Sequence, residues 1–587
     1  MAFTLYDARD ANRAPMVNPI VRMTPSQSQQ QRLSIGRAPV LMAGLGVIVG
    51  ALTALVVIGF RLLYESGQSA LLPGGMLGNY EALPAWQRLL LPIAGAGLIG
   101  LYMRHAARSD PRTGIGFVIE RTTYHEALLP LRNAIHQLVV ATIAIVSGHS
   151  VGREGPSVHL GATAGSQVGQ WLGLPHNSLR TLVACGTAAA IGASFNTPLA
   201  GVAFAMEVVV MEYTIAGFLP VIIAGVTATA LARLVFGTGI VFSVPVLTIE
   251  GLHELPLVLV LGLLLGGLAA VFIRLLRIVG QALTHWPPLR RTLTGGLIVG
   301  LIGLVVPQVM GIGYDTIAAT LAGELGIALL IAIVAAKLVA TTAVIGLGVP
   351  GGIIGPTLVM GAAAGGAVGL VAESMIAAPL GGPALYALLG MGAMMGATLR
   401  APLAALTAML ELTANPGIIM PGMLTIAAAT LSAREIFQTD SIHHLALGER
   451  GLDPRRNPLL QAASRLGILQ LIDPHCRQLA ASTPADGIDA ALAAPPSWLL
   501  HDAGQDGLPT RLSDPATLRD NRHAGRAAFA GSIPLLAIDE KASLREAIEQ
   551  LREAGDAALL ATRPVGHGTV EWQGIVTRTA IYRAYLS

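Results

Sequence analysis

The chain has 587 residues, of which 53% are apolar and only 12% are charged. Soluble domains carry roughly 25% charged residues, so this composition excludes a purely soluble protein. The 37 basic and 34 acidic residues leave a formal net charge of +3, which is too small on so long a chain to indicate a nucleic-acid ligand. The two cysteines, Cys185 and Cys476, lie far apart and predict neither a disulfide framework nor a CxxC metal site.

Residues 1–37 form a polar arm that holds five arginines and two aspartates. The arm lacks the apolar core of a signal peptide, so membrane insertion must depend on internal segments. By the positive-inside rule, the excess of arginine predicts that the arm lies in the cytoplasm.

The first internal segment, residues 39–60, runs for 22 residues without a charge. A helix of that length is about 33 Å long and spans the ~30 Å hydrocarbon core of a bilayer. Residues 214–232 and 256–273 predict spanning helices of the same kind. The apolar runs 89–103 and 325–336 are shorter than the ~17 residues that a span needs, which predicts tilted, broken or re-entrant helices.

Apolar character ends near Phe437, and from Arg450 onward the chain is charged and interrupted by proline. This change in composition predicts a membrane domain at 38–450 and a soluble C-terminal domain at 451–587. We expect the C-terminal domain to lie in the cytoplasm, as the arm does.

The membrane domain contains an internal repeat. Small residues and prolines of segment 155–169 recur in 355–369 at a constant offset of 200, and those of 192–207 recur in 396–411 at an offset of 204. The repeat predicts two related halves, about 38–240 and 250–440. Duplicated halves with helices broken at matching positions indicate a transport site near the midplane of the membrane.

Pro156 and Pro356 each predict the start of a helix inside the membrane, because proline suits the first helical turn. Glycine-rich segments precede both, GREG at 152–155 and GGIIG at 351–355. Free backbone N–H groups and the positive ends of two helix dipoles would form an anion site there. The alternative is that the breaks only allow tight packing of helices.

These residues resemble the motifs of the CLC family of chloride channels and chloride/proton exchangers: GREGP at 152–156, GxxGP at 352–356 and FNTPLAG at 195–201. The likeness extends over about residues 40–440. It implies an all-α membrane protein, a multi-pass protein of a bacterial inner membrane, with two inverted repeats of tilted, broken helices. It also implies a homodimer in which each subunit carries its own pore.

The resemblance matches Glu154 to the family's gating glutamate, whose carboxylate competes with a halide. An ionisable residue at membrane depth is functional by default, which agrees with that role. The alternative is a salt bridge between Glu154 and Arg153, but adjacent residues on a helix do not face each other. The anion-binding positions implied around the two helix starts are Arg153, Glu154, Gly155, Ile353, Ile354 and Gly355.

Two further anion-binding positions depart from the family pattern. Segment 112–116, RTGIG, corresponds to the family's GSGIP, so Thr113 supplies the hydroxyl and Gly114 follows it. The missing proline at Gly116 argues against a helix start there. His443 takes the place of the pore tyrosine, with an interfacial pair formed with His444 as the alternative.

In proton-coupled members of the family a second glutamate follows the one that matches Glu207. This chain has Val208 there, so the proton-relay position is lost and we expect passive conduction. His443 or water is an alternative relay. We expect Glu207 and Glu411, at equivalent repeat positions, to cap or brace helices, and Lys337 and Arg400 to be structural.

In the C-terminal domain, Ser543 and Glu546 form a capping box that opens a helix ending near Gly555. Strand-like segments follow at 557–562 and 574–578. The order resembles the second half of a tandem CBS module, whereas residues 465–535 match the first half poorly. The aspartate that commonly binds ribose is replaced by Ala580, so we expect no nucleotide binding.

The sequence and its resemblance together predict a gated chloride channel, with Glu154 as the gate, chloride as the transported ligand, and no cofactor, metal or catalytic residue. The alternatives are a chloride/proton antiporter and a related transporter of another anion, such as fluoride or nitrate. An enzyme is the remaining alternative, because segment 148–152 fits the GxSxG motif of hydrolases. That motif has meaning only at a strand-to-helix turn.

Overall fold

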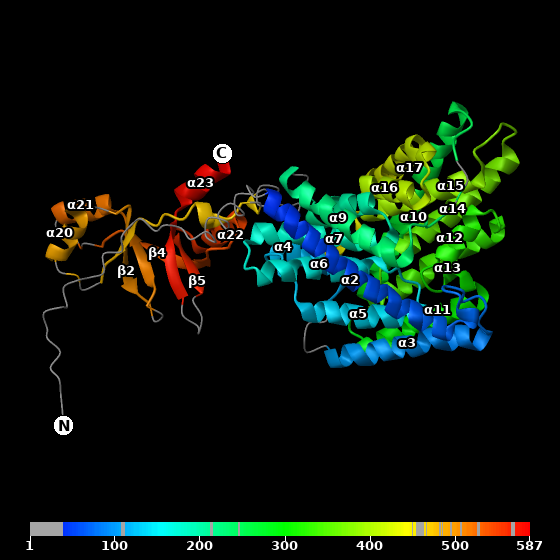
Figure 1. Cartoon of the computed structure of the whole chain (residues 1–587), viewed down its shortest axis with the longest axis horizontal. Helices are drawn as coiled ribbons and strands as arrows, with labels where there is room; N and C mark the ends of the chain where they lie inside the picture. The colour runs from blue at the N-terminus through cyan, green and yellow to red at the C-terminus, as the bar shows by residue number, and fades with distance from the viewer. Residues whose placement is uncertain are drawn as a thin grey trace, which may run out of the picture. The chain divides into compact units, whose positions relative to one another are not determined.

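The computed structural model (Figure 1) describes residues 39–586 apart from 107–111, 212–214, 243, 245–246, 449, 453–462, 465, 481–482, 484, 494–495, 505–506, 525–526, 528 and 565–569. The predicted N-terminal arm lies outside the described residues. The described chain forms two compact units, a membrane unit up to Arg456 and a C-terminal unit from Asn457 that also takes in residues 175–177.

The membrane unit is helical. In its described part, ten helices are long and apolar enough to cross a membrane, by length and composition. Its helices are α2 (Pro39–Leu71), α3 (Ala85–Ala106), α4 (Gly114–Tyr124), α5 (Leu131–Val146), α6 (Glu154–Trp171), α7 (His176–Phe195), α8 (Pro198–Phe204), the π-helix η3 (Ala205–Val210), α9 (Ile215–Phe236), α10 (Leu255–Ala282), α11 (Pro288–Val305), α12 (Tyr314–Leu321), α13 (Ile327–Gly346), α14 (Ile354–Met375), α15 (Gly382–Leu399), α16 (Pro402–Thr413), α17 (Ile419–Leu431) and α18 (Ile442–Gly448).

The three long predicted spans correspond to α2, α9 and α10. The short runs 89–103 and 325–336, which predicted tilted, broken or re-entrant helices, lie in helices long enough to cross a membrane: α3 has 22 residues, with Pro92 inside it, and α13 has 20. α13 continues through the buried Lys337, whose ammonium donates to the carbonyls of Val309 at 3.0 Å and Gly311 at 3.1 Å. The charge that ended the apolar run is thus satisfied by backbone oxygens. Lys337 is structural, as expected, and so is Arg400, which pairs with Asp440 at 2.5 Å.

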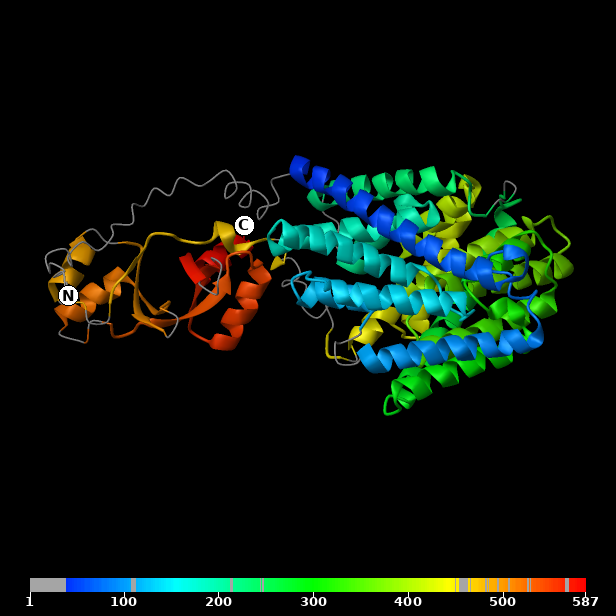
Figure 2. The ribbon, with the colours of Figure 1, turned by 60° about the horizontal axis from the view of Figure 1, so that its bottom comes forward.

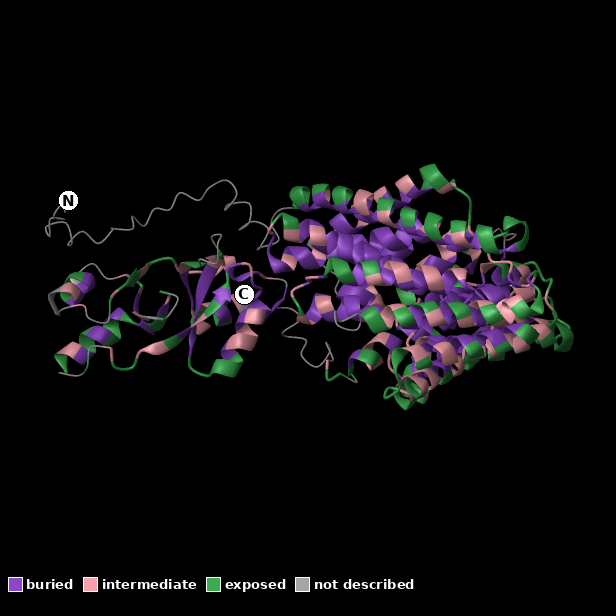
Figure 3. Cartoon of the chain, turned by 90° about the horizontal axis from the view of Figure 1, so that it is seen from below, coloured by how far each residue is buried: buried purple, intermediate pink, exposed green. Residues whose placement is uncertain are grey.

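Equivalent helices of the two repeats form the buried centre of the membrane unit, coloured purple in Figure 3. In the most apolar window of α7, 94% of the residues are buried, against 33% in α3. α6 crosses α7 at Gly161 and Gly165, and α14 crosses α15 at Gly361 and Gly365, so closely that a Cβ on any of these glycines would collide with the facing backbone. Small residues allow this approach, and they explain why the central helices are only moderately apolar.

Longer helices surround this centre. α2 lies along α9, and α3 lies along α11 (Figure 2). At both contacts a glycine meets backbone atoms of the partner helix: Gly50 faces Ala224, and Gly300 faces Leu89. The exposed sides of these outer helices carry large apolar residues such as Leu55 and Leu98, which suits a surface in contact with lipid.

Two glutamates connect the repeats reciprocally, as the capping prediction for Glu207 and Glu411 expected. The carboxylate of Glu207, in the first repeat, accepts the N–H groups of Leu403 at 3.1 Å and Ala404 at 2.8 Å in the first turn of α16. The carboxylate of Glu411, in the second repeat, accepts those of Leu199 at 3.0 Å and Ala200 at 2.8 Å in the first turn of α8. Each repeat therefore caps a helix of the other.

The C-terminal unit contains two successive β-α-β-β-α units. The first comprises β1 (Cys476–Gln478), α20 (Ala485–Ala493), β2 (Trp498–Ala503), β3 (Pro509–Ser513) and α21 (Pro515–His523); the second comprises β4 (Ile533–Asp539), α22 (Leu544–Ala554), β5 (Ala558–Pro564), β6 (Val570–Val576) and α23 (Arg578–Leu586). The strands form one sheet in sequence order, with β1–β2 and β4–β5 parallel and the other pairs antiparallel.

Segment 465–535 thus has the same order of elements as the second unit, whereas its poor match to the first half of a CBS module stays a prediction. Proline is tolerated at the start of a strand or helix, and Pro509 is the first residue of β3 and Pro515 the first residue of α21. In the second unit the predicted capping box is confirmed, and α22 ends before Gly555.

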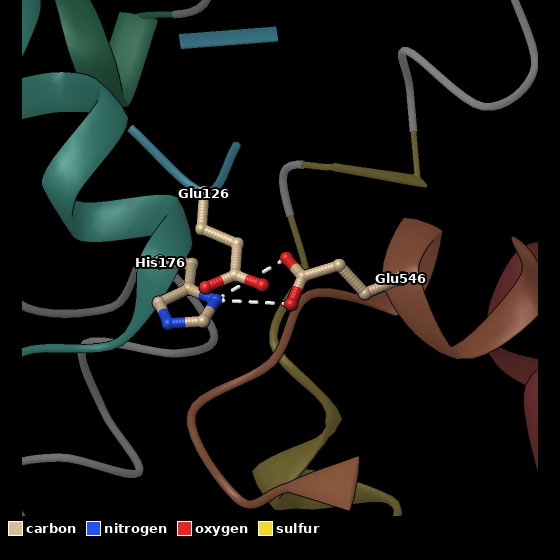
Figure 4. Close-up of side chains that lie close together, drawn as sticks. All are labelled: Glu126, His176 and Glu546. Atoms are coloured by element: carbon tan, nitrogen blue, oxygen red, sulfur yellow. Dashed lines mark hydrogen bonds and ion pairs between the residues drawn. The ribbon is translucent and has the colours of Figure 1, made fainter. Parts of the chain in front are cut away.

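Figure 4 shows His176 facing the carboxylate of Glu546, with 3.0 Å between Nδ1 and Oε2. Burial raises the pKa of Glu546, but hydrogen bonds with His176 and Ser543 outweigh it and hold this pKa below its usual value.

Replacing Glu207 by Gln, or Glu411 by Gln, should destabilise the membrane unit by about 1–2 kcal/mol, because each change weakens the cap of a helix in the other repeat. The measurement is the thermal denaturation midpoint of the purified protein in detergent. Glu435→Gln is the matched control, since the Glu435 side chain is 63% exposed and pairs with the adjacent Arg434. A midpoint for either variant equal to that of the control would contradict the prediction.

Candidate anion site between two helix starts

The loops that precede α6 and α14 meet at a pair of glycines. The N–H of Gly152 donates to the carbonyl of Gly352 at 2.7 Å, and the N–H of Gly352 donates to the carbonyl of Gly152 at 2.8 Å. This antiparallel bridge joins positions separated by the repeat offset of 200. Pro156 and Pro356 are the third residues of their helices, so both predicted helix starts are confirmed, and the bridge holds them together.

Glu154 is the first residue of α6, and its side chain is fully buried beside this bridge. A Cβ built on Gly352 would lie 2.7 Å from its Oε2 atom, and one built on Gly355 would lie 3.2 Å from Oε1. Only glycine at these positions leaves room for the carboxylate. Its Oε2 atom has no hydrogen-bond partner among the described residues. The carboxylate thus lies at the positive ends of two helix dipoles, where an anion would be attracted.

Tyr314, the first residue of α12, donates its hydroxyl to Oε1 of Glu154 at 3.0 Å. Sequence reasoning did not identify this tyrosine, because no repeat or spacing relates position 314 to position 154. The local signal is a break at Gly311 and Gly313, both with positive φ, immediately before α12. Glycine is tolerant of this conformation and lets α12 begin close to the site.

Arg153 does not form a salt bridge with Glu154, which was the alternative role of Glu154 in the sequence analysis. Its guanidinium donates to the hydroxyl of Tyr64 at 2.7 Å and lies over the rings of Phe195, at 4.8 Å, and Tyr314, at 5.1 Å. Among the described ion pairs none joins Arg153 to Glu154 within 4.0 Å. Aromatic faces therefore hold the buried positive charge of Arg153, although Arg153 makes no direct contact that would neutralise the carboxylate of the adjacent Glu154.

Two cavities adjoin these residues. The larger, of about 510 Å³, is lined by Arg153, Tyr64 and Tyr314 and also by Arg61 and Arg233. The smaller, of about 30 Å³, is lined by Glu154 and by apolar residues of several helices, including Ile354, Leu358, Phe204 and Met395. Phe195 lines both. The lining of the larger cavity also includes the carboxylates of Asp315 and of Glu65, which pairs with Arg61 at 2.6 Å, so its arginines are partly balanced. The smaller cavity is narrow and largely apolar, with the Glu154 carboxylate at its wall.

The remaining predicted ligands lie at the starts of α14 and α4 and on α18. Ile353 precedes α14 and Ile354 begins it, next to Gly355. α4 begins at Gly114, so the expectation that no helix starts there without a proline is wrong; Gly114 has a φ of +87° and serves as the first residue instead. Thr113 precedes it and makes no capping hydrogen bond through its side chain.

His443 lies on α18, and its buried Nε2 atom has no hydrogen-bond partner among the described residues. Its neighbour His444 places Nε2 3.0 Å from the sulfur of Met211. None of the hydrogen bonds of the described chain joins His443 to Glu154 or Thr113, so its place in the pore stays a prediction.

The hydrolase alternative is not supported by the geometry. Segment 148–152 connects two helices, α5 and α6, and does not follow a strand. The Ser150 hydroxyl lies 2.9 Å from the hydroxyl of Thr341, whereas a nucleophilic serine needs a histidine as its partner.

Residues 89–434 match the family model described as voltage gated chloride channel. The chain belongs to this family, the CLC proteins. A relative from Ralstonia nicotianae, named as a ClcB-like candidate chloride channel protein, is 33% identical over 427 residues, which cover 71% of this chain and 99% of that protein. The H(+)/Cl(−) exchange transporter ClcA of Vibrio vulnificus is 28% identical over 434 residues, covering 72% of this chain and 92% of the relative.

Among solved structures, that of a eukaryotic CLC transporter has a TM-score of 0.58 at 18% identity and covers 92% of this chain and 97% of its own. This likeness concerns the fold. The chain is accordingly a multi-pass CLC membrane protein, mostly helical with a small strand-containing C-terminal region, and chloride transport is the activity of its family.

Replacing Tyr314 by Phe removes the hydroxyl that holds the Glu154 carboxylate in place and should favour its departure from the site. A hydrogen bond to a charged group contributes about 1.5–3 kcal/mol, so we expect chloride efflux from proteoliposomes at neutral pH to rise roughly tenfold if release of the carboxylate limits the rate. Tyr64→Phe is the matched control, because Tyr64 contacts Arg153 instead of Glu154. Equal efflux from both variants would show that Tyr314 does not hold the carboxylate.

Proposed function

We propose that this chain exchanges chloride for protons across the membrane, with Glu154 as the residue that both ions use in turn. The observation that carries the proposal is the buried carboxylate at the starts of α6 and α14, in the position that an anion would take. The Vibrio relative named as an exchange transporter, which this chain covers over 92% of its length, supports coupling to protons.

The chemistry follows from competition for one site. An ionised Glu154 is attracted to the two helix starts and blocks them, whereas a protonated Glu154 loses that attraction and yields the site to chloride. Backbone dipoles bind a halide weakly enough to release it, which a fixed lysine in the same place would not. Arg153, held by Tyr64 and two aromatic rings, raises the local concentration of anions in the larger cavity.

Passive chloride conduction is the second candidate function. Val208, at the position of the family's second glutamate, is buried on η3 and has no group that carries a proton. The Ralstonia relative, named as a candidate channel, also favours this function. The two candidates share the Glu154 gate and differ in whether protons reach it from the cytoplasmic side.

The deciding experiment is reconstitution of the purified protein in liposomes with an imposed chloride gradient. Exchange predicts that chloride movement drives protons uphill at a fixed stoichiometry, which a pH electrode records. Chloride flux without proton movement would establish the passive channel instead. Flux of fluoride with none of chloride would assign the protein to another anion.

Glu154→Gln should keep chloride flux and lose both proton coupling and the dependence of flux on external pH. The amide has nearly the shape of the carboxylate, but it carries no charge to compete with chloride and does not titrate. The measurement is chloride efflux over a series of external pH values. A variant that keeps the wild-type pH profile would place the gate at another residue.

We further propose a regulatory role for the C-terminal unit, whose two β-α-β-β-α units resemble a tandem CBS module. Truncation after Gly451 should retain chloride flux, because all anion-site residues precede the cut and Arg450 keeps its 2.9 Å ion pair with Glu120 on α4. Full-length protein titrated with ATP in a calorimeter should show little binding, since Ala580 replaces the ribose-binding aspartate. Loss of flux, or tight ATP binding, would contradict the respective half of this prediction.

The homodimer, the bacterial inner membrane and the cytoplasmic location of both termini are further parts of this proposal. They rest on family membership and, for the termini, on the arginine-rich arm.

A further inference from the structure

Arginines gather where α3 ends and α11 begins. Residues 255–314 contain four arginines and no aspartate, glutamate or lysine. One of them, Arg290, is the third residue of α11, and Arg104 lies in the last turn of α3. The two helix ends are in contact, because a Cβ built on Gly100 would lie 2.7 Å from the Cα of Leu289. The positive charges of both helices therefore lie at one end of the membrane unit.

The protein does not balance these charges. Arg290 and the adjacent Arg291 occupy the first turn of α11, where the positive end of the helix dipole disfavours a cation. This turn, which the structure describes in full, holds no acidic residue. Among the described ion pairs none includes Arg104, Arg290 or Arg291. Arg291 donates to the carbonyl of Gly346 at 3.3 Å, but its buried Nε atom has no hydrogen-bond partner among the described residues. An anion from outside the chain would satisfy both the dipole and the guanidinium groups.

The surface next to these charges is apolar. Large exposed side chains lie on both helices within about three turns of the arginines, Leu98 and Leu101 on α3 and Leu297 and Leu301 on α11. Trp286, in the loop before α11, is also exposed, and tryptophan is typical of the boundary between acyl chains and headgroups. Cations at the helix ends and leucines along the helices are the two surfaces that a phospholipid with a negative headgroup needs.

We propose that the ends of α3 and α11 bind one anionic phospholipid, whose phosphate contacts Arg104 and Arg290 and whose acyl chains lie against the leucines of both helices. The proposal goes beyond the proposed function, because it holds for an exchanger and for a channel alike. α2 and α3 are consecutive spanning helices with a short connection, so α3 ends on the side of the membrane where α2 begins. With the N-terminal arm in the cytoplasm, as proposed above, the lipid belongs to the cytoplasmic leaflet.

The experiment is a titration of the purified full-length protein in neutral detergent with phosphatidylglycerol, and with phosphatidylcholine of the same acyl chains. Native mass spectra measure the fraction of protein that retains a lipid molecule. We expect phosphatidylglycerol to bind about tenfold more tightly, because arginines near a membrane surface attract a net negative headgroup. The double variant Arg104→Gln and Arg290→Gln should lose this preference, and Arg290→Gln alone should reduce it. Arg434→Gln is the matched control, since the Arg434 side chain is 62% exposed and pairs with Glu435.

An unchanged preference in the double variant would overturn the proposal. An equal loss in Arg434→Gln would show that net charge alone attracts the lipid, and equal binding of both lipids by the wild type would show that only the apolar surface is used; either result would overturn it as well. The thermal midpoint in lipid-free detergent verifies folding, and Arg290→Gln should not lower it, because the dipole of α11 disfavours the cation that is removed. These measurements involve neither chloride nor proton flux, so their failure and the failure of the proposed function are distinguishable.

Discussion

The two hydrogen bonds between Gly152 and Gly352 are the contact on which the anion site depends. They connect loops from different repeats, and they hold the first turns of α6 and α14 close enough for one carboxylate to lie at both. Either helix start alone would offer a few N–H groups and about half a unit of positive charge. Together they create a position that favours an anion without a cation in contact with it. Side chains larger than hydrogen at these two glycines would separate the loops.

The residues around the bridge have distinct physical roles. Glu154 lies at the two helix starts where we propose that an anion binds, and Tyr314 donates to it from a helix that belongs to neither start. Arg153 lies against two aromatic rings and donates to Tyr64, so its positive charge lines the larger cavity without an ion pair to the Glu154 carboxylate. This separation matters because a direct ion pair would hold Glu154 in place, whereas a transport cycle needs it to leave and return.

Much of this arrangement could be predicted from the sequence, because repetition and backbone chemistry leave clear signals there. The constant offset of 200 identified both helix starts, and the matching positions of Glu207 and Glu411 indicated a shared capping role. Side-chain contacts between remote segments leave no such signal. Tyr314 meets Glu154, and His159 meets Gly114, only because helices far apart in the sequence pack together. The ends of α13 were also misjudged, since a buried lysine interrupts an apolar run without ending the helix.

The reciprocal caps of Glu207 and Glu411 bear on how such a protein is assembled and how it could arise. One repeat on its own would have a glutamate with no helix start to cap, and a helix start with no glutamate to cap it. A second copy placed opposite the first would satisfy both, which is the arrangement expected of an ancestral pair of separate, identical half-length chains. During synthesis the same relation means that the first half is complete only after the second half has entered the membrane. Correct packing of residues made early therefore depends on residues made some 200 positions later.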